Sequence, residues 1–379
     1  MFLLFNPPFF RHRRRGWKSA GRVKSQGKGG RVDFRSRDPE KTSRPSGDRE
    51  IDSYLKDLKS LKGGEQAIAN LIKCGRSAIE PLRRFLFEGS PSVVYQPRQM
   101  AVQALGGLGA RDLLVEYLRR EKDIADPAVR LGEEAVESAA AREFIRWPSE
   151  EVFQFLLGIA RERCLPGVCE ALGEFKRREA IPFLVMGLED DVCRRAAEEA
   201  LRKIGPPAHP DLIQAAVTPR PGREEETPSS LFRRRSAVRL LGEIGVQAFQ
   251  WPLLRPLLRE ADGEILAGAF RIAAGLGGTK DRAAAFRALI RALERADWYV
   301  QDQIEKALAQ NLSAVRPLFE EEIRQRQAAA KGARSRDPVG AALWRICRRA
   351  EGAGQPPTSR EERNWASGPG SLAKRRREE

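Results

Sequence analysis

Histidine is nearly missing from this chain of 379 residues, which contains only His12 and His209. Because histidine is the usual general base and the commonest metal ligand, catalytic triads, His-metal clusters and zinc-protease motifs are all but excluded. We expect His209, which lies in a proline-rich segment, to be a solvent-facing turn residue. The sequence offers no catalytic residue, and we expect no cofactor.

Cysteine is also scarce, odd in number and free of any CxxC spacing. The five are Cys74, Cys164, Cys169, Cys193 and Cys347. This usage argues against a disulfide framework or a zinc site and fits a reducing, cytoplasmic setting. Cys74 stands where related segments have leucine or isoleucine, so we expect core packing. Cys164 and Cys169, five residues apart around a Leu-Pro-Gly segment, match no metal loop, and we expect them to be incidental.

Long apolar runs are lacking too. No stretch approaches the roughly 18 to 20 uncharged apolar residues that span a bilayer. The opening Met1–Phe5 is apolar, but prolines follow at once and the arginines come after the apolar run rather than before it, which is unlike a signal peptide. We expect a cytoplasmic protein with no membrane contact.

Charged residues are unevenly distributed along the chain. The formal net charge is +16, yet residues 1–50 hold 14 Lys/Arg against 5 Asp/Glu, and residues 51–350 are nearly balanced with 48 against 42. The basic signal, which by itself suggests a nucleic acid or another anionic partner, therefore belongs chiefly to the N-terminal segment.

Residues 1–50 show no helical period and are rich in Arg, Lys, Gly, Ser and Pro, so we interpret them as a disordered basic arm. Upstream sequence translated from a mis-called start would have the same character. The arm's candidate nucleic-acid contacts are Arg11, Arg13, Arg14, Arg15 and Lys18. Residues 351–379 resemble a disordered polar tail.

Alternating β patterns are almost absent beyond residue 50, and amphipathic segments of about 10 to 15 residues predict an all-α fold. A helix end of the form Leu-x-x-hydrophobic, usually followed by glycine, recurs. Its copies start at Leu71, Leu105, Leu172, Leu201, Leu241 and Ala273. We expect the glycines to end helices in the left-handed conformation, and a second apolar helix follows each end, which gives antiparallel pairs.

Aspartates precede several first helices, at Asp126, Asp191, Asp262 and Asp297, and predict N-caps. Asp-Pro-x-Val-Arg at 126–130, Ala-Leu-x-x-Ile-Gly at 200–205 and Ala-Ile-x-x-Leu at 180–184 together resemble the HEAT-like repeat of the phycobilisome-lyase type. The resemblance covers about residues 51–330 and implies an α-solenoid of about seven to eight helical pairs. We place the solenoid at 51–350, with a polar insertion at 218–230 and a capping helix near 340–349.

Repeats of this type occur in bilin lyases and in many proteins without pigment chemistry, so the resemblance does not carry that activity over. The iron-binding HEAT-repeat hydroxylases need His-Glu pairs, which this sequence lacks. HEAT-like DNA glycosylases hold a damaged nucleotide with an Asp among aromatics, as in Asp297-Trp298-Tyr299. We expect instead an N-cap aspartate followed by aromatics that pack on the previous pair, as at Asp126, Asp191 and Asp262.

The second helices of the pairs, which line the concave face of such solenoids, carry many arginines. The candidate partner-binding residues are Arg83, Arg84, Arg119, Arg120, Arg255, Arg259, Arg287, Arg291 and Arg316. Interspersed glutamates also fit an ordinary solvated face, and the Arg233–Arg235 run is equally ambiguous. We expect a non-catalytic scaffold that binds a protein partner. A nucleic-acid-binding or DNA-repair protein and a bilin-lyase-like protein are the alternatives.

Overall fold

The computed structural model describes residues 46–60, 63–89, 93–220, 222, 226–276, 278–330 and 338–350. The candidate arm residues Arg11, Arg13, Arg14, Arg15 and Lys18 and the tail 351–379 lie outside this part of the chain. Residues 46–50, which we assigned to the arm, belong instead to a helix.

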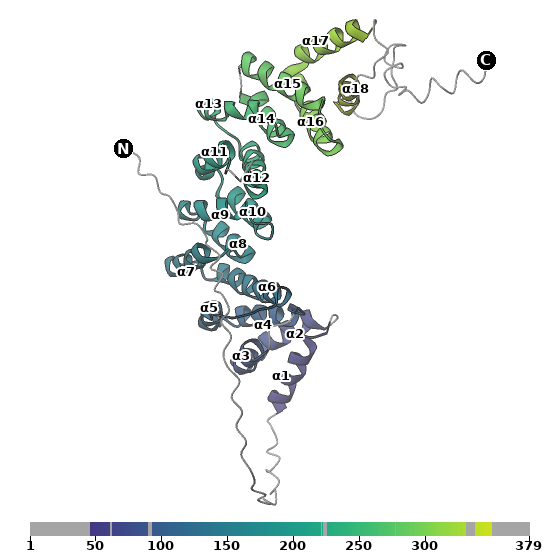
Figure 1. Ribbon diagram of the computed structural model, residues 1–379. Helices are drawn as coiled ribbons and strands as arrows, with labels where there is room; N and C mark the ends of the chain where they lie inside the picture. Colours follow the sequence, from purple (N-terminus) through teal and green to yellow (C-terminus); the bar gives the residue numbers. More distant parts are fainter. Residues whose placement is uncertain are drawn as a thin grey trace, which may run out of the picture. The chain divides into compact units, whose positions relative to one another are not determined.

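The described residues form helices and no strand, as predicted. One set of α-helices forms a row in which each member contacts the next. The row consists of α2 (Gly64–Lys73), α4 (Gln96–Gly107), α6 (Pro127–Glu143), α8 (Pro166–Phe175), α10 (Arg194–Ile204), α12 (Pro228–Ile244), α14 (Gly263–Leu276), α16 (Trp298–Gln310) and α18 (Pro338–Ala350). We call it the even row; its members can be followed in Figure 1.

The odd-numbered α-helices form a second layer beside this row (Figure 1), and from α3 onward each contacts the even helix that follows it. They are α1 (Ser46–Asp57), α3 (Ile79–Phe87), α5 (Arg111–Arg119), α7 (Glu150–Glu162), α9 (Ile181–Gly187), α11 (His209–Val217), α13 (Trp251–Leu254), α15 (Thr279–Leu293) and α17 (Leu312–Ala330). Short 3-10 helices join them: η1 (Gly75–Ala78), η2 (Phe144–Arg146), η3 (Arg178–Ala180), η4 (Pro206–Ala208), η5 (Ala248–Gln250) and η6 (Arg255–Arg259).

Glycines let neighbouring helices of the even row approach closely. A Cβ on Gly167 of α8 would lie 1.8 Å from the carbonyl oxygen of Ser138 on α6, and one on Gly173 would lie 2.7 Å from Cα of Ala200 on α10. Any side chain at either position would force the backbones apart, so α8 is pressed between its two neighbours.

The predicted helix ends are confirmed at four glycines. Gly75, Gly109, Gly205 and Gly245 have φ of 62°, 75°, 74° and 92°, values that cost a residue with a Cβ more than they cost glycine. α8 ends without a glycine: Lys176 takes the left-handed conformation there, with φ of 52°.

The aspartate caps are confirmed at three of the four predicted positions. Asp126, Asp262 and Asp297 each accept backbone hydrogen bonds from the first turn of the helix that follows. The prediction was wrong at Asp191. Asp190 is the acceptor there, from two N–H groups at 2.8 and 2.9 Å, because the chain completes a turn before α10 begins at Arg194.

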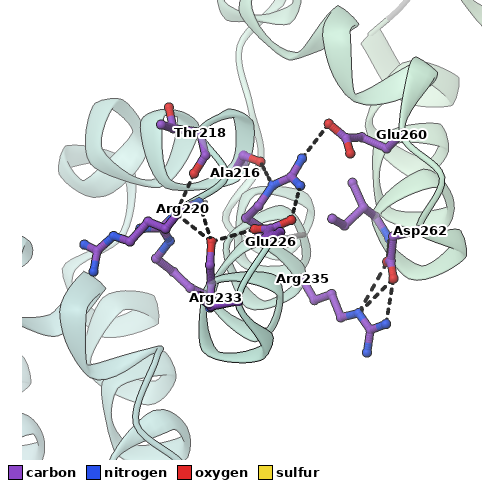
Figure 2. Close-up of polar contacts among 12 residues, drawn as sticks. Ala216, Thr218, Arg220, Glu226, Arg233, Arg235, Glu260 and Asp262 are labelled. Carbon is purple, nitrogen blue, oxygen red and sulfur yellow. Dashed lines mark hydrogen bonds and ion pairs between the residues drawn. The ribbon is translucent and has the colours of Figure 1, made fainter. Parts of the chain in front are cut away.

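The predicted insertion at 218–230 is shorter than expected, because α12 already begins at Pro228 with Thr227 as its N-cap. Thr227 N–H also donates to the carbonyl of Arg220, which closes the ends of the insertion. Two arginines that we left ambiguous hold this segment in place. Arg233 donates to the carbonyl of Thr218 at 2.5 Å (Figure 2). Arg234 pairs with Glu226 at 2.7 Å.

A buried ionic cluster joins α4, α5 and α6. Glu133 accepts from Arg98 and Tyr117, and lies 2.6 Å from Lys122. Only 3% of the Glu133 side chain and 9% of the Arg98 side chain are exposed. Burial alone would raise the pKa of Glu133, but the hydrogen bonds from Arg98, Lys122 and Tyr117 outweigh it and lower that pKa below 4.5. The cluster is a polar contact between α4, α5 and α6 in an otherwise apolar packing of helices.

Candidate functional site

Most of the candidate partner-binding arginines lie on helices of the odd layer, but the structure does not bring the candidates together as one surface. Arg83, Arg119 and Arg120 line a hollow of about 860 Å³ on α3 and α5. Arg259 and Arg291 line a second hollow of about 580 Å³ near η6 and α15. Neither α9 nor α11, which lie between these groups, contains an arginine or a lysine. The candidate arginines therefore fall into two separate groups rather than one continuous row.

Most of the predicted arginines in the first group are already engaged. Arg83 lies 3.5 Å from Glu116, and Arg84 lies 3.2 Å from Glu80 on its own helix. Arg119 stacks on the ring of Phe155 at 5.4 Å. Arg120 donates to a backbone carbonyl at 3.0 Å. These contacts are those of an ordinary solvated helix face.

The remaining candidate arginines, on η6, α15 and α17, also lie among acidic side chains. Arg255 lies 3.0 Å from Asp281, and Arg316 lies 4.0 Å from Glu320. Arg287 is exposed on α15. The hollow that contains Arg259 and Arg291 also includes acidic side chains from the loops before α14 and α16. Intermixed acids offset these cations as well.

A different basic surface lies on the even row, across α10, α12, α14 and α16. We call this surface, a hollow of about 610 Å³, the α10–α16 groove. It is lined by Arg194, Glu198, Phe232, Arg235, Ser236, Arg239, Glu264, Ala267, Gly268, Arg271, Tyr299 and Gln303. Four arginines face two glutamates, so the lining carries an excess of positive charge.

Aromatic side chains are exposed along this groove. Phe232, which is 39% exposed, lies between the guanidinium groups of Arg194 at 4.4 Å and Arg235 at 5.9 Å. Tyr299 is 45% exposed, and its neighbour Trp298, which packs on it edge to face, is 81% exposed. We had expected the aromatics after Asp297 to pack on the preceding pair, and that was wrong.

Counter-ions are distributed unequally among the groove's arginines. Arg235 lies 2.6 Å from Asp262 and 2.7 Å from Glu264, as Figure 2 shows for Asp262. Arg239 pairs with Glu198 on α10. Arg271 on α14 makes no ion pair with any described residue, and its buried Nε has no hydrogen-bond partner there.

The environment of Arg271 disfavours its charge. Burial lowers the pKa of this guanidinium; Glu243 opposes that effect and Arg239 adds to it. A guanidinium remains charged even so. Arg271 is therefore a partly desolvated cation without a bound anion, and it faces a groove whose rim is aromatic.

Sequence reasoning missed this groove because its arginines come from three first helices, far apart in the chain, whereas the candidate partner-binding arginines were chosen on second helices and Arg235 was left ambiguous. A signal was present: Arg239 and Arg271 each stand two residues before a recurring helix end, at Leu241 and Ala273, and Arg235 lies about one turn before Arg239. Aligning the repeats by their polar positions would have grouped these residues.

Two expectations about reactive side chains were wrong. His209 is not a solvent-facing turn residue: it begins α11 and is 3% exposed, and its burial lowers the pKa of the imidazole.

Cys164 and Cys169 are not incidental neighbours. Their sulfurs lie 4.0 Å apart and close to the sulfur of Cys193. Hydrogen bonds from the Cys169 and Cys193 thiols lower the pKa of Cys164 to about 5. Cys74 packs partly buried against the core, as expected.

Neither a protein-family model nor a curated protein sequence matches the chain. Among the described helices, none combines the length and the apolar character that crossing a membrane requires.

Proposed function

We propose that the chain is a non-catalytic scaffold, a HEAT-like α-solenoid that binds an acidic segment of a protein partner in the α10–α16 groove. The succession of contacting helical pairs, five of whose first helices end at a residue with positive φ, supports the solenoid architecture. Such architectures bury their core unit by unit and leave long helix faces for binding.

Arg271 is the observation that carries the binding proposal. A partly buried guanidinium without a counter-ion is costly, and a carboxylate from a partner would supply the missing charge and accept hydrogen bonds. Phe232 and Tyr299 would pack against apolar side chains on either side of that carboxylate, since aromatic residues and arginine dominate protein interfaces. The groove thus fits an acidic peptide that carries apolar side chains.

Nucleic acid is a second candidate, favoured by the 81% exposed Trp298 beside a basic groove, because bases stack on exposed aromatic rings. The ion pairs made by Arg235 and Arg239 weigh against it. A phosphate backbone needs a row of free cations, whereas one carboxylate needs only Arg271.

Binding of two labelled probes to the full chain tests the proposal: a 20-residue peptide rich in Glu and Leu, and a single-stranded oligonucleotide. Fluorescence anisotropy is measured at two salt concentrations for the wild type, Arg271→Met and, as a control on the other layer, Arg84→Met. Removing one charge-assisted contact of about 1.5–3 kcal/mol should weaken peptide binding roughly 10- to 150-fold. Arg84→Met should bind as the wild type does.

Equal peptide affinity for wild type and Arg271→Met would refute the groove assignment. Binding of the oligonucleotide alone, with a steep salt dependence, would replace the protein partner by nucleic acid. Truncation of residues 1–45 separates the two parts of the chain: oligonucleotide affinity lost with that segment would assign nucleic-acid binding to the predicted arm.

A further inference from the structure

Three cysteines from different parts of the chain converge at one point of the fold. Cys164 directly precedes α8, Cys169 lies in that helix, and Cys193 is the N-cap residue of α10. Their three Sγ atoms lie within 4.8 Å of one another, and those of Cys164 and Cys169 are 4.0 Å apart. Among the described residues, this is the only group of metal-binding side chains that converges so closely.

The local backbone explains how a spacing of five residues brings two thiols together. Leu165 is extended, with φ of −129° and ψ of 130°, and Pro166 starts α8 immediately afterwards. The extended Leu165 interrupts helical geometry between the two cysteines, and Sγ of Cys164 lies 4.0 Å from Sγ of Cys169 in the first turn of α8. In one uninterrupted helix the same spacing would point the two side chains apart.

A separate turn positions the third thiol, that of Cys193. Asp190 accepts hydrogen bonds from the N–H groups of Val192 and Cys193, which fixes the turn that places Cys193 at the start of α10. Gly187 at the end of α9 covers the cluster: a Cβ there would lie 3.5 Å from Sγ of Cys164 and 3.7 Å from Sγ of Cys169. The sulfurs are thus positioned by three helices.

Access is limited to one side. Cys169 is 5% exposed and Cys193 is 1% exposed, whereas Cys164 is exposed. Cys164 lines a hollow of about 270 Å³ together with Glu134 and Asp190. An ion can therefore enter from this hollow, and water can occupy a fourth coordination position there.

We propose that Cys164, Cys169 and Cys193 form a metal-binding site for zinc, with its fourth position open to the hollow. Zinc–sulfur bonds of about 2.3 Å place the sulfurs of a tetrahedral site about 3.8 Å apart, so the observed spacing needs only a small contraction. Thiolates without histidine select soft or borderline metals, chiefly zinc and copper(I).

Charge favours zinc over copper(I). Three thiolates around a divalent ion leave a formal charge of minus one, and around a monovalent ion minus two. Two of the sulfurs are buried, and Glu134 and Asp190 line the adjoining hollow. A larger uncompensated negative charge would be more costly in such surroundings. Binding releases the thiol protons, so zinc affinity should rise with pH.

Titration of the full chain with zinc alone, in reducing buffer, tests the site. A chromogenic chelator reports stoichiometry and affinity, and substitution with cobalt(II) reports tetrahedral thiolate coordination through its visible absorption bands. We expect one equivalent of tightly bound zinc. Cys164→Ser should weaken binding by more than about 100-fold, beyond the effect of losing a residue that only supports a ligand. Cys74→Ser, at a site distant from the cluster, is the matched control and should bind normally.

Cys193→Ser should also abolish binding, but Cys193 is buried, so this substitution risks disrupting the fold. The exposed Cys164 therefore provides the decisive variant. The circular dichroism spectrum of Cys164→Ser should match that of the wild type. Failure to bind one equivalent of zinc, or equal affinities in Cys164→Ser and wild type, would overturn the site. Copper(I) binding through the same cysteines without zinc binding would overturn the choice of metal. A Cys164–Cys169 disulfide that persists in reducing buffer would overturn the metal assignment itself.

Discussion

The buried cluster around Glu133 makes the strongest prediction about stability. Glu133→Gln preserves the side chain's size but removes the charge that Arg98 and Lys122 share. Lys122 retains Glu137 at 2.9 Å, whereas Arg98 keeps only neutral acceptors, the carbonyl of Leu86 among them. Loss of one partner of a buried ion pair costs about 3–5 kcal/mol. We expect a loss in this range, since 97% of the Glu133 side chain is shielded from solvent.

Amide hydrogen exchange is the appropriate measurement, because a long helical stack can open locally without unfolding as a whole. A loss of 3–5 kcal/mol lowers protection factors in α4, α5 and α6 by roughly 150- to 5,000-fold. The matched control is Glu80→Gln, which removes the exposed pair with Arg84 and should cost at most about 0.5 kcal/mol.

Acidification gives the same prediction a second test. The pKa of Glu133 is lower in the fold than its ordinary value of 4.5, so its ionised form stabilises the fold fully above that pH. This contribution disappears as the pH falls through the lower folded value, and the difference between wild type and Glu133→Gln should shrink accordingly. A cost below about 1 kcal/mol at neutral pH, or equal loss of protection in α14 and α16, would refute the reasoning.

Three further predictions concern single residues. His209 is buried and its pKa lies below the ordinary value of 6.5, so below that pH the unfolded chain binds a proton that the folded chain does not. The free energy of unfolding, measured by urea titration, should therefore decline as the pH falls below 6.5. His209→Gln should make this decline less steep. Asp126→Ala removes the cap of α6 and should cost about 1 kcal/mol, whereas Asp126→Asn should restore most of it. Gly167→Ala places a methyl group against the carbonyl of Ser138 and should lower the melting temperature far more than Gly158→Ala, where the space is open.

Local signals in the sequence were sufficient for the helices. Capping and termination depend on residues within one turn, so Asp126 and Gly205 predict their own roles from type and position. The error at Asp191 arose from two consecutive aspartates, either of which fits the pattern. Only the backbone of the turn before α10 decides that Asp190 is the residue that accepts these hydrogen bonds.

The burial of His209 could have been predicted from the repeats. His209 precedes a proline and follows an alanine, as Ile181 does in another second helix, and Trp251 also precedes a proline. All three are nearly fully buried. The general tendency of histidine for the surface misled the interpretation, because the position in the repeat outweighs the preference of the residue type.

The cysteine cluster could not be obtained in this way, and repeat positions group the arginines of the α10–α16 groove without showing that they line one hollow. Each joins residues from consecutive helical pairs, and their convergence depends on how closely those pairs approach. The approach of α8 to α10 depends in turn on Gly173, whose missing side chain leaves room for Ala200. A sequence pattern places these residues on helices, but the distance between helices is a property of the packed core.

The apolar faces of the pairs are nearly interchangeable, since leucine and alanine recur at equivalent positions throughout. A stack held together by such faces alone could slip in register, whereas a buried ion pair is satisfied in only one arrangement. Three joints of the even row carry an ion pair whose glutamate is buried, although only Arg98 among the arginines is buried as well: Arg98 with Glu133, Arg239 with Glu198, and Arg345 with Glu305. Their Coulombic gain is partly cancelled by desolvation, so their main effect is to fix which helices meet. The α10–α16 groove inherits its geometry from one of these joints, because Glu198 and Arg239 both line it.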